Sequence, residues 1–186
     1  MKKAITLSLS LMFISLWGYS QHEHHTAKED ATAKKPASPH EMAMSNVGKM
    51  HVHIEYSSPR VKGRVIWGGL VPYDQVWVTG AHKATSVSFT ENVVVGGVTI
   101  AKGTYALFTI PGKEKWIVIL NKNHQQHLAD DYNIKDDVVR LSVTPQPLDH
   151  VQEELLFEVK EVTDTKGTIT LSWEKLAVSF DVLISK

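Results

Sequence analysis

Apolar and polar residues alternate over short segments of this chain, a pattern typical of β-strands with one buried face. The first clear segment places Val52, Ile54 and Tyr56 on one side and polar residues on the other. Residues 93–100 predict a hairpin, because two short valine-rich runs flank a Gly-Gly pair. We expect a short helical turn around residues 127–132.

Two strands in the middle of the chain are apolar at nearly every position. They lie in the run Gly103 to Lys122 and are joined through Pro111-Gly112-Lys113, so we expect both of their faces to be covered. The C-terminal region predicts three more strands, separated by a turn at 164–167 and a break near Glu174-Lys175. About seven to nine strands at this spacing predict an all-β domain, an antiparallel β-sandwich or a partly open barrel.

The N-terminal region has a different pattern. Lys2 and Lys3 precede an apolar stretch that ends at Trp17, which predicts a cleaved signal peptide over residues 1–20. That stretch is shorter than the roughly 20 residues of a membrane span. Residues 21–46 are polar and predict a disordered leader, followed by a single domain over residues 47–186. We therefore expect an exported protein, periplasmic or extracellular, with no membrane span in the mature chain.

Composition narrows the possible partners. The chain has no cysteine, so its core must stabilise it without disulfides. Basic and acidic residues number 20 each, and cleavage would remove Lys2 and Lys3, leaving a small negative charge. Nucleic-acid-binding domains carry a marked basic excess, so we expect no nucleic-acid partner.

The densest polar chemistry is the run YSSPRVKGRVIWG, residues 56–68. In an extended strand, Arg60, Lys62 and Arg64 would form one row, suited to a carboxylate, sulfate or phosphate. Cations on an exposed edge strand also prevent edge-to-edge aggregation, so both interpretations stay open. The candidate anion site combines this row with a small-residue loop further along, and comprises Ser58, Arg60, Lys62, Arg64, Thr79, Gly80, His82 and Lys83.

Histidine and methionine cluster in the N-terminal third of the chain. Imidazole binds copper and zinc, and thioether favours Cu(I), so the leader is a candidate for loose copper or zinc binding. Its candidate ligands are His22, His24, His25, His40, Met42 and Met44. A second candidate is the polar face of residues 51–55, with His51, His53 and Glu55 at alternate positions. A polar strand face without metal has the same pattern.

Several motifs occur in a fixed order along the chain. They are Ser58-Pro59, Lys62-Gly63-Arg64, Trp67-Gly68, Pro72-Tyr73, Thr79-Gly80-Ala81, Gly103-Thr104-Tyr105 and Trp173-Glu174. With these motifs, the region from about Val47 to Lys186 resembles domain-of-unknown-function family 2911, exported bacterial proteins without an assigned activity. The resemblance implies a secreted β-rich domain and no particular mechanism.

The chain departs from this family's pattern in two segments. The usual run is tryptophan, arginine, threonine, glycine, alanine, asparagine, glutamate, and here Val78, His82 and Lys83 replace the arginine, asparagine and glutamate. The usual tryptophan-glycine pair after the Asn-Lys turn is also absent, since the chain reads NKNHQQHLADDY. If the family's polar cluster is a site, this member has altered it.

The sequence leaves three classes of function open. The first is an exported, non-catalytic binding module for an anionic ligand or a cell-envelope protein, with weak copper or zinc binding by the leader. The second is an enzyme whose metal is held by His51 and His53, with His82 as a third ligand. The third is a structural adaptor of the cell envelope. The chain has neither a Gly-x-Ser-x-Gly elbow nor a His-Glu-x-x-His pair.

Overall fold

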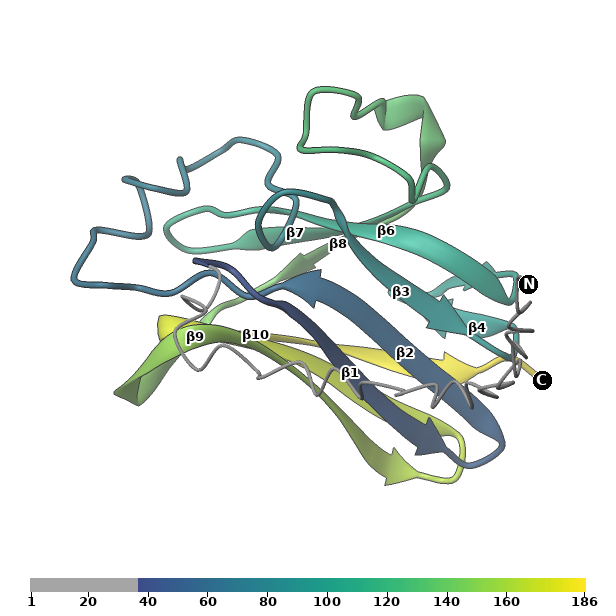
Figure 1. Ribbon diagram of the computed structural model, residues 1–186. Coiled ribbons are helices and arrows are strands. Elements are labelled where there is room, and N and C mark those ends of the chain that lie inside the picture. The colour runs from purple at the N-terminus through teal and green to yellow at the C-terminus, as the bar shows by residue number, and fades with distance from the viewer. Residues whose placement is uncertain (1–36) are drawn as a thin grey trace, which may run out of the picture. The chain divides into compact units, whose positions relative to one another are not determined.

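The computed structural model describes residues 37–186, which form two antiparallel sheets packed face to face (Figure 1). The six-stranded sheet contains, in spatial order, β1 (His40–Val47), β2 (Met50–Ser57), β3 (Thr85–Phe89), β6 (Gly103–Ile110), β7 (Trp116–Asn121) and β8 (Asp137–Val143). The four-stranded sheet contains β5 (Val98–Ile100), β4 (Val93–Val95), β10 (Lys166–Ile184) and β9 (Gln146–Thr163). The predicted antiparallel sandwich is confirmed, and neither sheet closes into a barrel.

The described residues contain one helical turn, the 3-10 helix η1 (Ile134–Asp136). No helix forms over residues 127–132, where a helical turn was expected; the chain instead makes one hydrogen-bonded turn, in which the Tyr132 amide donates to the Ala129 carbonyl at 3.1 Å. No helix within residues 37–186 is long and apolar enough to cross a membrane.

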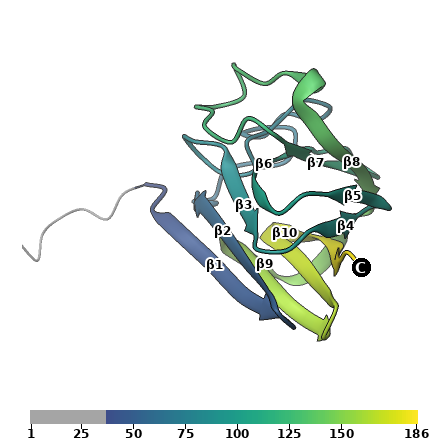
Figure 2. The same ribbon diagram turned by 90° about the vertical axis from the view of Figure 1, so that its right-hand side faces the viewer.

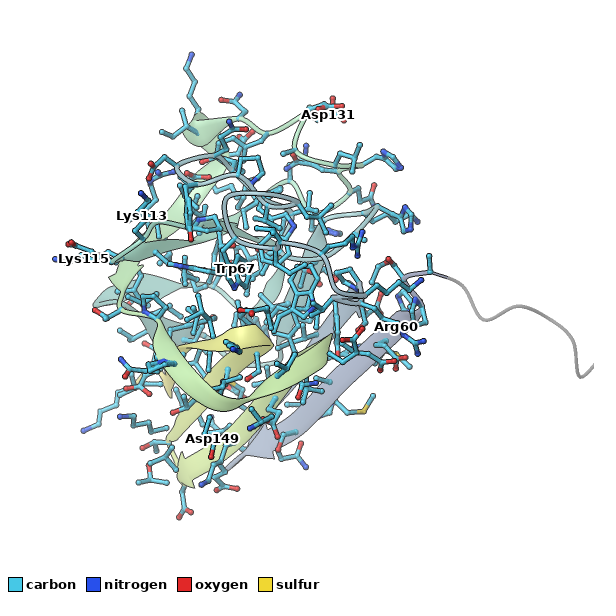
Figure 3. The ribbon with its side chains drawn as sticks, turned by 90° about the vertical axis from the view of Figure 1, so that its left-hand side faces the viewer. Arg60, Trp67, Lys113, Lys115, Asp131 and Asp149 are labelled. Atoms are coloured by element: carbon cyan, nitrogen blue, oxygen red, sulfur yellow. The ribbon has the colours of Figure 1, made fainter. Side chains whose placement is uncertain are left out.

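The main core lies between the sheets and contains a cluster of indole rings. Trp116 and Trp173 are fully buried, and Trp67 contacts Trp77, Trp116 and Trp173 edge to face, with ring centroids 4.8 to 5.9 Å apart. Trp67 belongs to the loop that follows β2, and Figure 3 shows it well inside the molecule. Edge-to-face pairs add about 0.5 to 1.5 kcal/mol each beyond area burial, so this cluster stabilises one end of the sandwich.

The four-stranded sheet tests two sequence predictions, a hairpin turn and a break between strands. Gly96 and Gly97, at φ of 58° and 83°, close the β4–β5 hairpin as predicted. The break expected near Glu174 is instead a bulge inside the continuous strand β10, with Glu174 at φ of 55°. The extra residue shifts the alternation, so that Trp173 and Val178 both face the core.

Strand β1 occupies a segment that the sequence assigned to the disordered leader. It pairs with β2 along its whole length, from His40 opposite Ser57 to Val47 opposite Met50. The folded domain therefore begins at or before His40 rather than at Val47. The predicted signal peptide, with most of the predicted leader, lies in residues 1–36, outside the described part of the chain.

The outer face of β6 and β7 is covered by loops, which confirms the expectation from their apolar sequences. Phe108 and Ile119 are fully buried there, in a second, smaller core with Val78, Ala84 and Ala106. The covering segments are residues 76–84 and 123–136. Figure 2 shows both above β6 and β7, whereas β1 and β2 extend away from them.

The β1–β2 turn meets the β9–β10 turn at Gly48, which has a φ of 54°. A Cβ at Gly48 would lie 1.9 Å from the carbonyl oxygen of Asp164. We expect Gly48→Ala to lower the free energy of unfolding by about 3 kcal/mol, since a left-handed alanine costs about 1 to 2 kcal/mol and the contact must also open. Urea unfolding measures the loss.

The matched control is Gly63→Ala. Gly63 has a φ of 67°, but apart from its chain neighbours no atom lies within 4 Å of the position that a Cβ would take. In this variant the free energy of unfolding should fall only by the conformational cost of a left-handed alanine, about 1 kcal/mol. Equal losses in the two variants would mean that the contact between the turns adds no constraint.

Candidate functional site

The outer face of the six-stranded sheet has a covered half and an open half. A hollow of about 440 Å³ lies where the two halves meet. Its floor consists of outward side chains of the sheet, Glu55 and Ser57 from β2 and Ser86 from β3. The side chains around it come from β1 and from the two covering loops: His40, Lys83, His124, Gln125, Gln126 and His127.

The two covering loops are hydrogen-bonded to each other beside the hollow. Lys83 and His127 form an antiparallel bridge. The amide of Ala84 donates to the carbonyl of Gln126 at 3.0 Å, and the amide of Leu128 donates to the carbonyl of His82 at 2.8 Å. The two segments therefore form one continuous wall.

Three residues of this wall have left-handed backbone conformations that side chains disfavour. Thr79, His82 and Leu128 have φ values of 55°, 65° and 59°. A β-branched residue rarely adopts this conformation, and such strain costs on the order of 1 to 3 kcal/mol per residue. Thr79 is fully buried, and its carbonyl accepts from the Thr85 hydroxyl at 2.9 Å, so the surrounding structure holds the strained conformation.

A buried asparagine ties the second loop to the sheet. Asn121, at the end of β7, donates through Nδ2 to the carbonyl of Asn133 at 3.1 Å and to Asp137 Oδ1 at 2.8 Å. Its Oδ1 accepts from Gln126 Nε2 at 3.3 Å. Gln126 is 2% exposed, lines the hollow, and its Oε1 has no hydrogen-bond partner within the described residues.

A second anchor of the loop is the cluster of Tyr132, Asp137 and Arg140. The Tyr132 hydroxyl donates to Asp137 Oδ2 at 2.6 Å, and Arg140 Nη1 lies 2.7 Å from the same oxygen. Burial, followed by the hydrogen bond to the Asp137 carboxylate, raises the pKa of Tyr132 to about 12. The Tyr132 ring packs on Phe108 with centroids 5.2 Å apart, which attaches the loop to the smaller core.

The basic row predicted for residues 60–64 does not form, because the chain leaves the sheet after β2 and turns at Lys62-Gly63. Arg60 pairs with Glu154, and Figure 3 shows it at the margin of the molecule. The Arg64 guanidinium donates to the backbone carbonyls of Val61 and Arg60. Lys62 is exposed in the turn. These three cations do not converge on a common point.

The other candidate anion ligands are also separated, except that Gly80 and Arg64 line the same smaller hollow. Ser58 is 2% exposed and donates to the carbonyl of Leu155 at 2.7 Å. The carbonyl of Gly80 accepts from Trp77 Nε1 at 3.0 Å, and Gly80 lines a smaller hollow of about 250 Å³ with Arg64 and apolar side chains. His82 is exposed on the wall. Among the eight candidates, Lys83 alone lines the larger hollow.

The strand histidines share one face, as predicted. His53 Nε2 lies 3.8 Å from Glu55 Oε1, and the ring centroids of His51 and His53 are 6.5 Å apart. His40 Nε2 lies 3.9 Å from Glu55 Oε2. Within residues 37–186, however, no three His, Cys, Asp or Glu side chains lie close enough to hold a metal ion, so His82 does not complete the set required by the enzyme hypothesis.

The remaining metal candidates fall into two groups. His40, Met42 and Met44 lie on β1, whereas His22, His24 and His25 lie outside the described residues. Sequence reasoning missed Ser86 and Gln126 as lining residues. The alternation in β3 could have placed Ser86 on the outer face, but nothing local marks Gln126, whose position depends on its contact with Asn121.

The Tyr132 cluster predicts a pH dependence of stability. Its contribution should be constant below about pH 10 and should fall as the pH rises towards 12, because the unfolded chain releases the phenolic proton first. Tyr132→Phe should remove this part of the fall. Urea unfolding between pH 8 and 12 tests it, with Tyr73→Phe, outside the cluster, as control. An unchanged alkaline fall in Tyr132→Phe would contradict the assignment.

One protein-family model matches nearly the whole described domain. The family model described as "Protein of unknown function (DUF2911)" matches residues 38–182, a range that includes β1. Comparisons with curated proteins and with solved structures gave no match. This match spans well over half of the chain. The protein with this two-sheet domain and loop-walled hollow is therefore a member of the DUF2911 family.

Proposed function

We propose that this domain is a binding module that holds a small anionic ligand in the hollow between the covering loops and the outer face of β2 and β3. The observation that carries the proposal is the grouping of donors around one hollow. Lys83 supplies an ammonium, His40, His124 and His127 supply imidazoles, and hydroxyls come from the floor. Charged N–H donors bind carboxylate or phosphate oxygens more strongly than neutral donors do.

An acceptor in the hollow refines the ligand class. Glu55 is a carboxylate that lines the hollow, with His40 and His53 beside it. A ligand with an anionic group alone would leave this acceptor without a donor from the ligand. The lining therefore favours a small molecule that carries a carboxylate or phosphate together with a hydroxyl or an amine.

The positions at which this chain departs from the family's usual pattern support the same location for the ligand site. Lys83 replaces the usual glutamate, and the segment 122–132 lacks the usual tryptophan-glycine pair. In the structure these two segments are bonded to each other through the Lys83–His127 bridge. Changes that are far apart in sequence thus meet at one hollow, and the change at residue 83 reverses its charge. We infer that this member has a ligand preference of its own.

We infer the compartment from the sequence. The predicted signal peptide supports export, so the ligand would be met in the periplasm or outside the cell. A cell-envelope protein is the partner that this placement favours.

Phosphate binding tests the proposed site. Thermal unfolding of the purified chain is followed with rising inorganic phosphate against potassium chloride at equal ionic strength. Phosphate at about ten times its dissociation constant should stabilise the fold by about 1.4 kcal/mol, a rise in Tm of about 3 to 6 °C. Lys83→Glu should abolish the difference between phosphate and chloride.

The matched control is Lys113→Glu. Lys113 is exposed at the far end of the β6–β7 hairpin, and Figure 3 shows it pointing into solvent. This variant makes the same charge change and should keep the phosphate response. No response in the unaltered chain, or an equal response in Lys83→Glu, would contradict the proposed site.

A further inference from the structure

The outer face of the β1–β2 hairpin carries a second group of side chains. The register places Met44 opposite His53 and Met42 opposite Glu55. Directly opposed Cβ atoms lie about 4.5 to 5.5 Å apart, and diagonal neighbours remain within reach of long side chains. Both methionines are unusually open for apolar residues, with exposed fractions of 56% and 55%. Two motifs that are separate in the sequence therefore become one surface.

We propose that this surface, the His/Met face formed by Met42, Met44, His51 and His53, binds Cu(I). The thioether of Met44 and the imidazoles of His51 and His53 are the ligands, and Met42, opposite Glu55, lies beside the site. The site goes beyond the anion-binding function proposed above and does not depend on it.

The hydrogen bonds of His51 favour metal ligation. Its Nδ1 lies 2.9 Å from Asn46 Oδ1, the cross-strand neighbour of His51. With the amide oxygen as acceptor, Nδ1 carries the proton and Nε2 keeps its lone pair. Metal-binding histidines are oriented in this way, by a partner that fixes the tautomer of the ring.

His53 contributes an unsatisfied nitrogen at the centre of the face. Its Nε2 is buried and has no hydrogen-bond partner within the described residues. The nearby Glu55 oxygen, at 3.8 Å, is too far for a hydrogen bond. A buried polar atom without a partner costs about 1 to 3 kcal/mol, and coordination to an ion would remove this cost.

The distance between the two rings permits a shared ion. An imidazole nitrogen lies about 1.1 Å from its ring centroid and about 2.1 Å from a bound metal, so two rings that share an ion have centroids at most about 6.4 Å apart. The centroids of His51 and His53 are 6.5 Å apart, near this limit. His53 Nε2 lies on the Glu55 side of its ring, so His53 must rotate towards His51 before the two imidazoles can share an ion. The ion would then lie almost between the rings, near the Met44 thioether across the strand pair.

The ligand types favour Cu(I) over zinc. Zinc prefers four ligands drawn from thiolate, imidazole and carboxylate, and within residues 37–186 no three such side chains come together. Thioethers are soft, neutral ligands that select Cu(I), which is also stable at low coordination number. The Met44 thioether therefore completes a ligand set that the two histidines leave incomplete.

Cu(I) affinity tests the proposal directly. The purified full chain competes for Cu(I) with the chromophoric chelator bicinchoninate, under anaerobic conditions with ascorbate. We expect one tight site, weakened at least about 10-fold in the double variant Met42→Leu/Met44→Leu. Leucine keeps the side-chain volume, and both positions are exposed, so this variant should fold normally, as circular dichroism and Tm will show.

Two controls locate the site. The triple variant His22→Ala/His24→Ala/His25→Ala should keep the tight site, since the proposal places no ligand there. Lys83→Glu should also keep it, and the methionine variant should keep the response to phosphate, so that the two proposals fail separately. Loss of the tight site in the triple variant, or an unchanged affinity in the methionine variant, would overturn the proposal.

X-ray absorption at the copper edge provides an independent readout. The chain has no cysteine, so a sulfur neighbour of copper can come only from methionine. We expect a copper–sulfur shell in the unaltered protein and its loss in Met42→Leu/Met44→Leu. A coordination shell of nitrogen and oxygen alone in the unaltered protein would overturn the proposal.

Discussion

The apolar outer face of β6 and β7 is the constraint on which the rest of this structure depends. Phe108 and Ile119 point away from the main core, and exposing them would forgo about 1.5 to 3 kcal/mol of burial each. The chain covers them with residues 76–84 and 123–136. These loops do not extend over β1 and β2, so the outer face is covered over β6 and β7 and open over β1 and β2. The hollow lies at the boundary between the covered and open parts.

The same loops explain why a strained backbone persists beside the hollow. Thr79 and Leu128 adopt left-handed conformations, and hydrogen bonds hold them: the Thr79 carbonyl accepts from the Thr85 hydroxyl, and the Leu128 amide donates to the His82 carbonyl. On the second loop, the Asn121 network and the Tyr132–Asp137–Arg140 cluster provide fixed contacts to the sheet. A wall built in this way is formed before any ligand arrives, which lowers the ordering cost of binding.

The hollow and the His/Met face are neighbours on one surface with different chemistry. Glu55 connects them, because it lines the hollow and also lies beside His53. The hollow offers charged and polar donors, which suit a hydrophilic anion. The His/Met face offers thioethers and imidazoles, which suit a soft ion. The His/Met face consists of outward side chains of strands whose inward side chains form the core, so its residues can change without altering the fold. The hollow combines such strand side chains with residues of the two covering loops.

The sequence by itself determined what depends on near neighbours in the chain. Alternation and apolar runs predicted the sandwich, the Gly-Gly hairpin and the covered faces of β6 and β7, because side-chain direction in a strand follows from local backbone geometry. Tertiary structure decided what depends on pairing between distant segments. β1 escaped prediction because its inward residues include the polar Glu41 and Ser45, so its strand character rests on its register with β2. That register, like the Lys83–His127 bridge, depends on contacts that no local pattern encodes.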